Sequence, residues 1–358
     1  MARILTIVGA RPQFVKAAVV SLALAECGVE EILLHTGQHY DERMSDIFFR
    51  EMGIPAPRHM LQVGSASHGA QTGRMLEGIE AALQQEKPDA VLVYGDTNST
   101  LAGALAAAKL HIPVAHVESG LRSFNRRMPE EINRVLTDHA STWLFCPTDS
   151  AVSNLAAEGI GGEHVFQVGD VMFDAAQRFG AHPSVAEAEI LARHGLTPGN
   201  YVLSTVHRAE NTDDPARLAV IVDALGRVAT HIPVALPLHP RTVALAGEAL
   251  TASGVKVLEP VGYLDMLALE RGAAVVATDS GGVQKEAFFQ RVPCVTFRDE
   301  TEWVELVETG WNTVIPPTDA EALAAAIIAA RTTPGQNVEL YGGGDASQRI
   351  AKVMAQVG

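Results

Sequence analysis

The sequence is poor in cysteine and carries no excess of positive charge. Its three cysteines (Cys27, Cys146 and Cys294) lie in unrelated segments, so we expect free thiols and a cytoplasmic protein. The formal net charge is −15, which argues against a nucleic acid partner. No apolar run reaches the roughly 18 residues of a membrane span. The opening residues MARILTIVGARP are typical of a first strand rather than a signal peptide.

Several catalytic motifs are also absent, and each absence argues against one class of enzyme. There is no HExxH, no CxxC and no His/carboxylate spacing typical of a metal site, so we predict an enzyme without a metal or other cofactor. The sequence contains no GxSxG elbow, which argues against a serine hydrolase. The segment GARPQFVK is neither a dinucleotide fingerprint nor a P-loop, because the required glycine and Lys-Ser/Thr spacings are missing.

What the sequence does contain is a regular alternation of short apolar runs with helical patterns. The runs are continuous, as expected for parallel strands covered on both faces. They comprise residues 4–8, 32–35, 90–93, 114–117, 142–146 and 165–168, then 201–206, 234–238, 255–258, 273–277 and 294–297. A chain of 358 residues suits two domains of ordinary size. We therefore predict two doubly wound α/β domains, residues 1–170 and 171–335, with a C-terminal helix in residues 336–358.

Polar side chains follow many of these runs. Ligands of parallel α/β sheets bind outside the carboxyl ends of the strands, and two such domains facing each other leave a cleft for a ligand. The side chains in question are Arg11, Asp96, Glu118, His207, His239, Asp279 and Ser280. We expect a binding site at this edge, although helix caps and turn residues would account for some of these positions.

The stretch TDSGGVQKEA, residues 278–287, is the strongest single candidate for binding. Ser280 is placed to cap a helix, and Gly281 and Gly282 let the backbone approach a ligand. Free N–H groups at a helix start bind anions, phosphate above all. Glu286, just over one turn further on, could accept hydrogen bonds from sugar hydroxyls. The alternative is an ordinary capped turn after a buried strand.

A second anion site is predicted where the first helix begins. Arg11 and Lys16 lie near its positive end, where a bound anion would relieve the repulsion of the cations. The alternative is that both side chains reach solvent.

Three acids point to proton transfer. Asp96 and Glu118 end strands separated by one crossover helix, and Glu130 follows Pro129 at the start of another helix. Acids that converge near phosphate-binding groups favour acid/base chemistry, although a first-turn acid such as Glu130 is also a routine partner of the helix dipole.

Two histidines, His207 and His239, are candidates of unequal strength. Either could be a structural histidine. His207 is favoured because Arg208 and Glu210 share its loop, and an imidazolium beside a diphosphate would stabilise a leaving group.

Eight motifs follow one another in order from residue 9 to residue 287, within a match that runs to about residue 349. They are GARPQFVK, TGQHYD, VYGDTNST, HVESGLRS, MPEEINR, VHRAEN, PLHP and TDSGGVQKEA. This set resembles the non-hydrolysing UDP-N-acetylglucosamine 2-epimerase family. The resemblance implies a glycosyltransferase-B-like fold with the active site between two Rossmann-like domains, and a C-terminal helix that returns to the first domain. It also implies a homodimer that interconverts UDP-GlcNAc and UDP-ManNAc for surface polysaccharides.

The resemblance further implies a mechanism and the residues that perform it. UDP is eliminated across C1–C2 to leave a 2-acetamidoglucal, and it adds back after a proton reaches the opposite face of C2. Asp96, Glu118 and Glu130 would share the proton transfers, and His207 would help the diphosphate leave. Substrate contacts would come from Arg11, Lys16, Arg122, His239, Ser280, Gly281, Gly282 and Glu286. Gln38, His39 and Arg74 match an adjacent regulatory site for a second UDP-GlcNAc.

The sequence also departs from the family pattern at two places. Trp303 replaces a substrate-contacting arginine, and the usual HRRE becomes His207-Arg-Ala-Glu210. Loss of a guanidinium is not conservative, so a different UDP-sugar is an alternative substrate, of the UDP-2,3-diacetamido-2,3-dideoxyglucuronate or UDP-N-acetyl-fucosamine type. The motifs are also compatible with a glycosyltransferase of the same fold, with an epimerase that hydrolyses its substrate to free ManNAc, and with a catalytically silent UDP-sugar binder.

Overall fold

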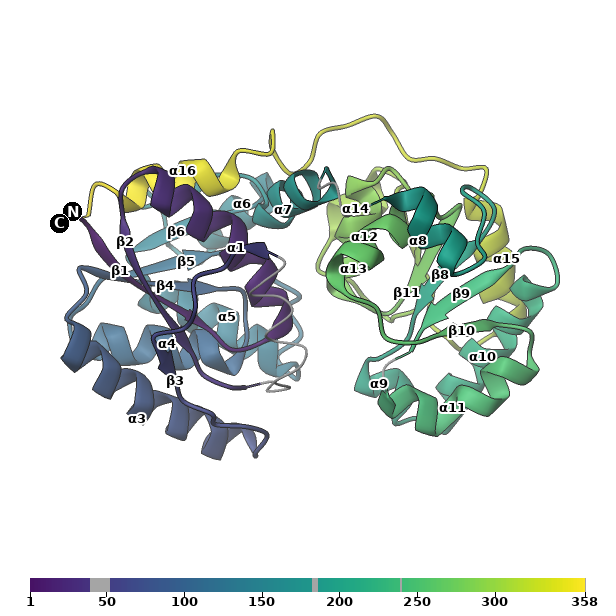
Figure 1. The fold of residues 1–358 in the computed structure, drawn as a ribbon, viewed down its shortest axis with the longest axis horizontal. Helices are drawn as coiled ribbons and strands as arrows, with labels where there is room; N and C mark the ends of the chain where they lie inside the picture. Colours follow the sequence, from purple (N-terminus) through teal and green to yellow (C-terminus); the bar gives the residue numbers. More distant parts are fainter. Residues whose placement is uncertain (39–51, 182–185, 239, 358) are drawn as a thin grey trace. The chain divides into compact units, whose positions relative to one another are not determined.

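The computed structural model describes residues 1–38, 52–181, 186–238 and 240–357 (Figure 1). The chain forms two compact units, one of Met1–Arg178 with Glu339–Gly358 and one of Phe179–Val338. The first boundary falls within helix α7 (Val171–Gly180), which the sequence analysis placed wholly in the second domain. Within the described ranges, no helix is both long and apolar enough to cross a membrane.

Unit 1 is built on a parallel sheet of seven strands in the order β3-β2-β1-β4-β5-β6-β7. The strands are β1 (Arg3–Val8), β2 (Glu30–His35), β3 (His59–Met60), β4 (Ala90–Tyr94), β5 (Val114–Val117), β6 (Trp143–Cys146) and β7 (Val165–Gln167). The helices are α1 (Arg11–Glu26), α3 (His68–Glu86), α4 (Asn98–Lys109), α5 (Pro129–Ala140), α6 (Asp149–Ala157), most of α7, and α16 (Ala346–Met354). The strand order reverses between β1 and β4, where such sheets bind their ligands.

Unit 2 is built on a parallel sheet of six strands in the order β10-β9-β8-β11-β12-β13. The strands are β8 (Val202–Thr205), β9 (Val234–Pro237), β10 (Lys256–Leu258), β11 (Val275–Thr278), β12 (Cys294–Thr296) and β13 (Asn312–Val314). The helices are α8 (Glu187–Arg193), α9 (Ala209–Thr212), α10 (Pro215–Ala229), α11 (Pro240–Ala252), α12 (Tyr263–Gly272), α13 (Gly281–Phe289), α14 (Val304–Glu308) and α15 (Ala320–Ala330). Here the order reverses between β8 and β11.

Each unit has its own apolar core, because its strands are covered by helices on both faces. In unit 1, Ile7 and Val93 are fully buried beneath the alanine-rich α4. A Cβ atom at Gly103 of α4 would lie 2.7 Å from the Ile7 side chain, so glycine allows the helix this close to the sheet. In unit 2, Val202 and Val275 occupy the equivalent place under α10 and α15. The predicted α/β architecture with parallel sheets is confirmed.

The C-terminal helix α16 lies against α1 in unit 1 (Figure 1). Its apolar face is buried through Ile350, Ala351 and Met354. Asp174 of α7 accepts hydrogen bonds from the first backbone N–H groups of α16, at 3.2 Å from Ala346 N and 2.7 Å from Ser347 N. The end of the chain is therefore part of the first unit.

Candidate active site

The loop between β1 and α1 is fixed by Gln13, a residue that the sequence analysis did not single out. The Gln13 side chain is buried, and its Oε1 accepts hydrogen bonds from Gly9 N (2.8 Å) and Ala10 N (3.0 Å). Its Nε2 donates to the Tyr94 carbonyl at 2.8 Å, at the end of β4. Gln13 thus joins the loops on both sides of the point where the strand order reverses. The only signal in the sequence was a polar residue on the inner face of a helix.

Lys16 and Glu118 form an ion pair, although 102 residues separate them in the chain. Both side chains are nearly buried, with exposed fractions of 11% and 9%. A Cβ atom at Gly95 would lie 3.3 Å from Lys16 Nζ and 3.4 Å from a Glu118 carboxylate oxygen, so the loop after β4 reaches the same place. Arg11 begins α1, but its side chain lies outside the described part of the structure.

The backbone of Glu118 has a φ of +69°, in the left-handed region that a non-glycine residue rarely adopts. Such a conformation costs on the order of 1–3 kcal/mol and is found mainly at functional sites. In this conformation the carboxylate of Glu118, at the end of β5, pairs with the ammonium of Lys16. This geometry supports a chemical role for Glu118.

Asp96 follows β4, which pairs with β5 in the sheet, so Asp96 and Glu118 leave neighbouring strands at the same edge. Arg134 of α5 forms an ion pair with Asp96, and Asn133 donates a hydrogen bond to the Asp96 carbonyl at 2.9 Å. The Asp96 side chain is 32% exposed, and that of Arg134 is 5% exposed. Arg134 is a second residue that sequence reasoning missed, because nothing in MPEEINR distinguishes it from a surface arginine.

The two acids at the start of α5 have different environments. Glu131 is buried and accepts hydrogen bonds from Ser123 N and Phe124 N, both at 2.9 Å. Glu131 also forms an ion pair with Arg134 at 3.2 Å. Glu130 is exposed. Glu131 therefore holds the loop before α5, and Glu130 is the acid that a substrate could reach.

Arg122 lies in a buried ion-pair network of unit 1. Its guanidinium donates to Asp138 at 2.7 Å and, through two nitrogens, to Glu158 at 2.7 Å each. Burial would raise the pKa of Asp138, but a hydrogen bond from His116 and the charges of His116 and Arg122 hold it below its ordinary value. The donors of Arg122 are thus bound to groups of its own unit, and its predicted contact with substrate stays a prediction.

Of the residues predicted for a regulatory site, the structure describes Gln38 and Arg74. Gln38 is buried and accepts hydrogen bonds from Ser99 N (3.0 Å) and Ser99 Oγ (2.7 Å), so it is tied to the start of α4. Arg74 is exposed on α3. His39 lies outside the described residues.

In unit 2, the loops after β8 and β11 are joined by Asp279. This buried carboxylate accepts hydrogen bonds from His207 N and Arg208 N, each at 3.1 Å, and from Asn211 Nδ2 at 3.2 Å. His207 Nδ1 lies 3.2 Å from Asp279, and half of its side chain is exposed. Burial acts to raise the pKa of Asp279, but the interactions with His207 and the hydrogen bonds from Arg208 and Asn211 together lower it. Asp279 therefore orients His207 while the ring stays accessible.

Helix α13 begins as predicted, with Ser280 as its N-cap. Ser280 Oγ accepts a hydrogen bond from Val283 N at 3.4 Å, and Thr278 Oγ1 accepts one from Ser280 N at 2.9 Å. A Cβ atom at Gly281 would lie 2.5 Å from a Glu302 carboxylate oxygen, so a larger residue there would have to displace the Glu302 side chain. The N–H groups of the first turn form the kind of site that binds phosphate.

Glu286 lies one turn into α13 and is largely buried, as is Glu270 at the end of α12. No hydrogen bond reaches either carboxylate oxygen of Glu270 from the described residues. Burial, and secondly the nearby Glu286, raise the pKa of Glu270 well above its ordinary value. Glu270 therefore holds its proton more tightly than an exposed glutamate does, beside the predicted ribose-binding carboxylate, and no pattern in the sequence indicated it.

Trp303, which replaces the expected arginine, is buried just before α14. The ammonium of Lys285, itself buried, lies 4.0 Å from the centroid of its ring. The nearby Arg298 is also buried and pairs with Glu302 at 3.0 Å. Trp303 thus covers a cation of α13 with an aromatic face. His239 lies outside the described residues.

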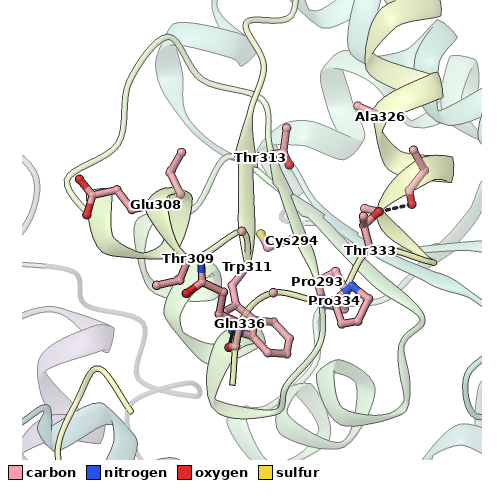
Figure 2. Close-up of a pocket in the computed structure, with 15 residues that line it drawn as sticks. Pro293, Cys294, Glu308, Thr309, Trp311, Thr313, Ala326, Thr333, Pro334 and Gln336 are labelled. Carbon is pink, nitrogen blue, oxygen red and sulfur yellow. Dashed lines mark hydrogen bonds between the residues drawn. The ribbon is translucent and has the colours of Figure 1, made fainter. Parts of the chain in front are cut away.

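A hollow of about 490 Å³ lies elsewhere in unit 2 (Figure 2). Pro293, Cys294 and Trp311 line it at the amino ends of β12 and β13. Ser280 follows the carboxyl end of the neighbouring strand β11, at the opposite edge of the sheet, so this hollow is not the predicted UDP site. Among the described side chains, no group of three or more His, Cys, Asp and Glu could hold a metal ion.

Comparison with known proteins decides the family. The model of the UDP-N-acetylglucosamine 2-epimerase family matches residues 23–355. The chain belongs to this family. It is 52% identical over 99% of its length to the whole of a UDP-2,3-diacetamido-2,3-dideoxy-D-glucuronate 2-epimerase of Pseudomonas aeruginosa. It is 42% identical to a UDP-N-acetylglucosamine 2-epimerase of Methanocaldococcus jannaschii, over 97% of both chains.

Solved structures of the epimerase family share the fold. The Methanocaldococcus jannaschii UDP-GlcNAc 2-epimerase in complex with UDP-GlcNAc and UDP superposes with a TM-score of 0.89 at 41% identity, over 98% of this chain and 99% of the other. The Neisseria meningitidis enzyme bound to UDP-GlcNAc gives a TM-score of 0.90 at 28% identity, over the same shares of the two chains. The predicted family, the glycosyltransferase-B-like fold and the assignment as an isomerase are confirmed.

Proposed function

We propose that this epimerase inverts C2 of a UDP-2-acetamido sugar, and that its substrate is UDP-2,3-diacetamido-2,3-dideoxy-D-glucuronate. The observation that carries the choice of sugar is the 52% identity to the Pseudomonas aeruginosa 2-epimerase named for it, over the full length of that protein. Trp303 supports it, because the arginine expected at a UDP-GlcNAc site is missing. The motifs alone favour UDP-GlcNAc as the substrate, with the diacetamido-glucuronate sugar as the alternative. The proposal reverses that order.

UDP-GlcNAc is the second candidate. It is supported by the 42% identity to the Methanocaldococcus jannaschii enzyme and by the fold shared with that enzyme in complex with UDP-GlcNAc. Both candidates have the same C1–C2 unit with its acetamido group. The proposed chemistry is therefore the same for both.

In the proposed reaction, a carboxylate removes the C2 proton and the C1–O bond to UDP breaks. The electron pair of the C2–H bond forms the C1=C2 double bond of a glucal, and UDP leaves with the electrons of the C1–O bond. The reverse addition, with a proton delivered to the other face of C2, gives the epimer. We assign these transfers to Asp96, Glu118 and Glu130. The ammonium of Lys16 supports a role of Glu118 as the base, because it stabilises the charged carboxylate.

Unit 2 supplies the groups that we assign to UDP. The capped start of α13 suits a diphosphate, and Glu286 is assigned to the ribose. His207, oriented by Asp279, would stabilise the negative charge that develops on the leaving diphosphate. A homodimer, a role in surface polysaccharide synthesis and a regulatory site at Gln38, His39 and Arg74 remain predictions of the resemblance.

Proton NMR of the purified protein in D2O, with each UDP-sugar in turn, tests the proposal. We expect the C2 epimer of the diacetamido-glucuronate substrate, with deuterium at C2. The kcat/KM for this substrate should be at least about tenfold above that for UDP-GlcNAc, which corresponds to about 1.4 kcal/mol of transition-state stabilisation. UDP-glucose, which lacks the acetamido group, is the control. Faster turnover of UDP-GlcNAc would establish the second candidate. Release of free sugar would establish a hydrolytic enzyme, and transfer to an acceptor without deuterium uptake would establish a glycosyltransferase.

A further inference from the structure

A buried histidine of β5 contacts the loop of Asp96 directly and the loop of Glu118 through Asp138. His116 has no exposed surface. Its Nδ1 lies 2.7 Å from Asp138 Oδ1, and its Nε2 lies 2.7 Å from the carbonyl oxygen of Gly95. The proposed mechanism does not use this residue.

Both partners of the ring can only accept a hydrogen bond. A carbonyl oxygen carries no proton. Asp138 acts as an ionised acceptor, because its other oxygen pairs with the guanidinium of Arg122 at 2.7 Å and also accepts a hydrogen bond from Gly120 N at 3.1 Å. A neutral imidazole has one donor and one acceptor nitrogen. Two bonds of this kind therefore require a proton on each nitrogen, which makes His116 an imidazolium.

The charges around the ring agree with this protonation state. Asp138 and Glu158 contribute two negative charges to the cluster, and Arg122 contributes one positive charge. A charged His116 brings the sum to zero, whereas a neutral ring would leave one negative charge uncompensated. An uncompensated charge in a protein interior is costly. His139, which also contacts Glu158 at 3.2 Å, is 48% exposed and belongs to the solvated edge of the cluster.

Another buried histidine of the same sheet gives the contrast. His35, at the end of β2, also has no exposed surface. Its Nδ1 accepts a hydrogen bond from Gly37 N at 2.8 Å and so carries no proton. Burial lowers the pKa of His35 to about 4. Burial alone thus yields a neutral histidine in this unit, and the two acceptors distinguish His116.

The contacts of His116 couple the loops of Asp96 and Glu118. Gly95 immediately precedes Asp96, and Asp138 binds the backbone N–H of Gly120, two residues after Glu118. We propose that His116, held with both ring nitrogens protonated, positions the carboxylates of Asp96 and Glu118 through Gly95 and Asp138. This role rests on the proposed function of the two acids. It makes His116 a positioning residue, since it touches neither the substrate nor the reacting atoms.

Nitrogen-15 NMR of the histidine rings tests the protonation state without any substrate. In the wild-type protein at pH 7.5, we expect His116 to show two protonated ring nitrogens whose protons exchange slowly with water. His35, which must show one unprotonated nitrogen, is the internal reference. His116→Gln and His116→Asn identify the resonances by difference. A single unprotonated nitrogen on His116 would overturn the proposal, whatever the enzyme's substrate proves to be.

Kinetics of the same variants test the positioning role. A neutral amide cannot donate to both acceptors, so the two loops lose a connection, and a misplacement of about 1 Å costs roughly a hundredfold in rate. We expect kcat for C2 deuterium uptake to fall by about that factor, with UDP affinity changed less than about threefold. The matched control is His59→Gln, which removes another histidine–carboxylate pair of unit 1 (2.8 Å to Glu86) and should keep kcat.

The outcomes separate this inference from the proposed function. If His116→Gln keeps kcat while the wild-type ring is doubly protonated, the positioning role is wrong. If kcat and UDP affinity fall together, His116 maintains the fold in general and the inference is also overturned. If the wild-type protein epimerises no UDP-2-acetamido sugar, the proposed function fails, and the ring spectrum still decides the protonation state. If neither variant folds, the wild-type spectrum still tests the proposal: slow exchange of two ring protons on His116 supports it, and one unprotonated ring nitrogen overturns it.

Discussion

The residues that face the proposed chemistry are held by partners far away in the sequence. Glu118 meets Lys16 of α1, Asp96 meets Arg134 of α5, and His207 meets a carboxylate at the end of β11. In each case the candidate residue comes from one loop, and the group that orients it comes from another element. Single-residue changes should therefore separate orientation from chemistry.

Glu118→Gln is the sharpest test of the acids. The amide keeps the size of the side chain but cannot accept the C2 proton, and loss of a general base costs about 10²–10⁴ in rate. We expect kcat for C2 deuterium uptake to fall in that range, while calorimetric binding of UDP is retained. Glu77→Gln, at an exposed position on α3, is the control and should leave both quantities unchanged. Deuterium uptake above a tenth of the wild-type rate would exclude Glu118 as the base.

Replacement of Trp303 tests whether its ring stabilises the buried Lys285. Trp303→Ala removes a buried indole, a change that costs about 3–5 kcal/mol in protein cores. Trp303→Phe keeps an aromatic face over the ammonium and should cost less, because a desolvated cation–π contact contributes about 2 kcal/mol. The measurement is the urea midpoint of unfolding. Equal costs for the two variants would show that the ring does not stabilise the cation.

Sequence reasoning found residues such as Asp96 and Ser280 because they follow apolar strands, and the edge of a parallel sheet can be read from the sequence. It did not find Gln13, His116 or Glu270. Each of these is a polar residue inside an apolar face, and its significance depends on a partner that only the fold supplies. Tyr94, for example, lies 81 residues from Gln13.

At the scale of elements, the long apolar runs were predicted well. The run at residues 90–93 lacks only the last residue of β4, and the run at 294–297 contains β12. Some short elements were not predicted. Strand β13 has three residues, NTV, and is defined by its pairing with β12 rather than by any apolar pattern of its own. Helices α9 and α14, of four and five residues, likewise carry too few residues for a helical period.

The packing of α12 against α13 makes the stability of unit 2 depend on pH through Glu270. Its pKa is raised in the folded state, so between pH 4.5 and the folded pKa the folded protein keeps a proton that the unfolded chain has lost. The free energy of unfolding therefore decreases as the pH rises above 4.5, by up to about 1.4 kcal/mol per pH unit. The decrease continues until the pH reaches the folded pKa.

Glu270→Gln should remove this dependence. The amide does not ionise, so we expect a higher free energy of unfolding at pH 8 than in the wild type, and a smaller difference between the two proteins at pH 5. Urea denaturation at both pH values is the measurement. Glu248→Gln, at an exposed position on α11, is the control. If the difference in free energy of unfolding between the wild type and Glu270→Gln is the same at pH 8 as at pH 5, then Glu270 is ionised in the folded protein.

The whole molecule divides the proposed chemistry between its two units. The acids Asp96, Glu118 and Glu130 belong to unit 1, and the capped start of α13, His207 and Glu286 belong to unit 2. Unit 1 is discontinuous in sequence, because α16 returns to it from the end of the chain, whereas unit 2 is the single stretch Phe179–Val338. This difference allows the functions of the two units to be separated experimentally.

A protein consisting of residues 179–338 should fold and bind UDP without catalysing the exchange of any proton at C2. It has a core of its own, in which Val202, Val234 and Val275 are fully buried, and α/β units of about 160 residues are within the size that folds alone. UDP that binds only the folded state should raise its free energy of unfolding by about 2.7 kcal/mol at a concentration of about one hundred times Kd. Thermal unfolding with and without UDP measures this.

Glu286→Gln in the same fragment is the matched control, because it keeps the fold but weakens the assigned contact with the ribose, so the increase caused by UDP should shrink. Deuterium uptake at C2 by the fragment would show that the acids of unit 1 are dispensable and would contradict the mechanism. A folded fragment that UDP does not stabilise would instead show that Lys16 and Arg11 of unit 1 dominate nucleotide binding. Stabilisation without exchange is the result that places UDP recognition in unit 2 and proton transfer in unit 1.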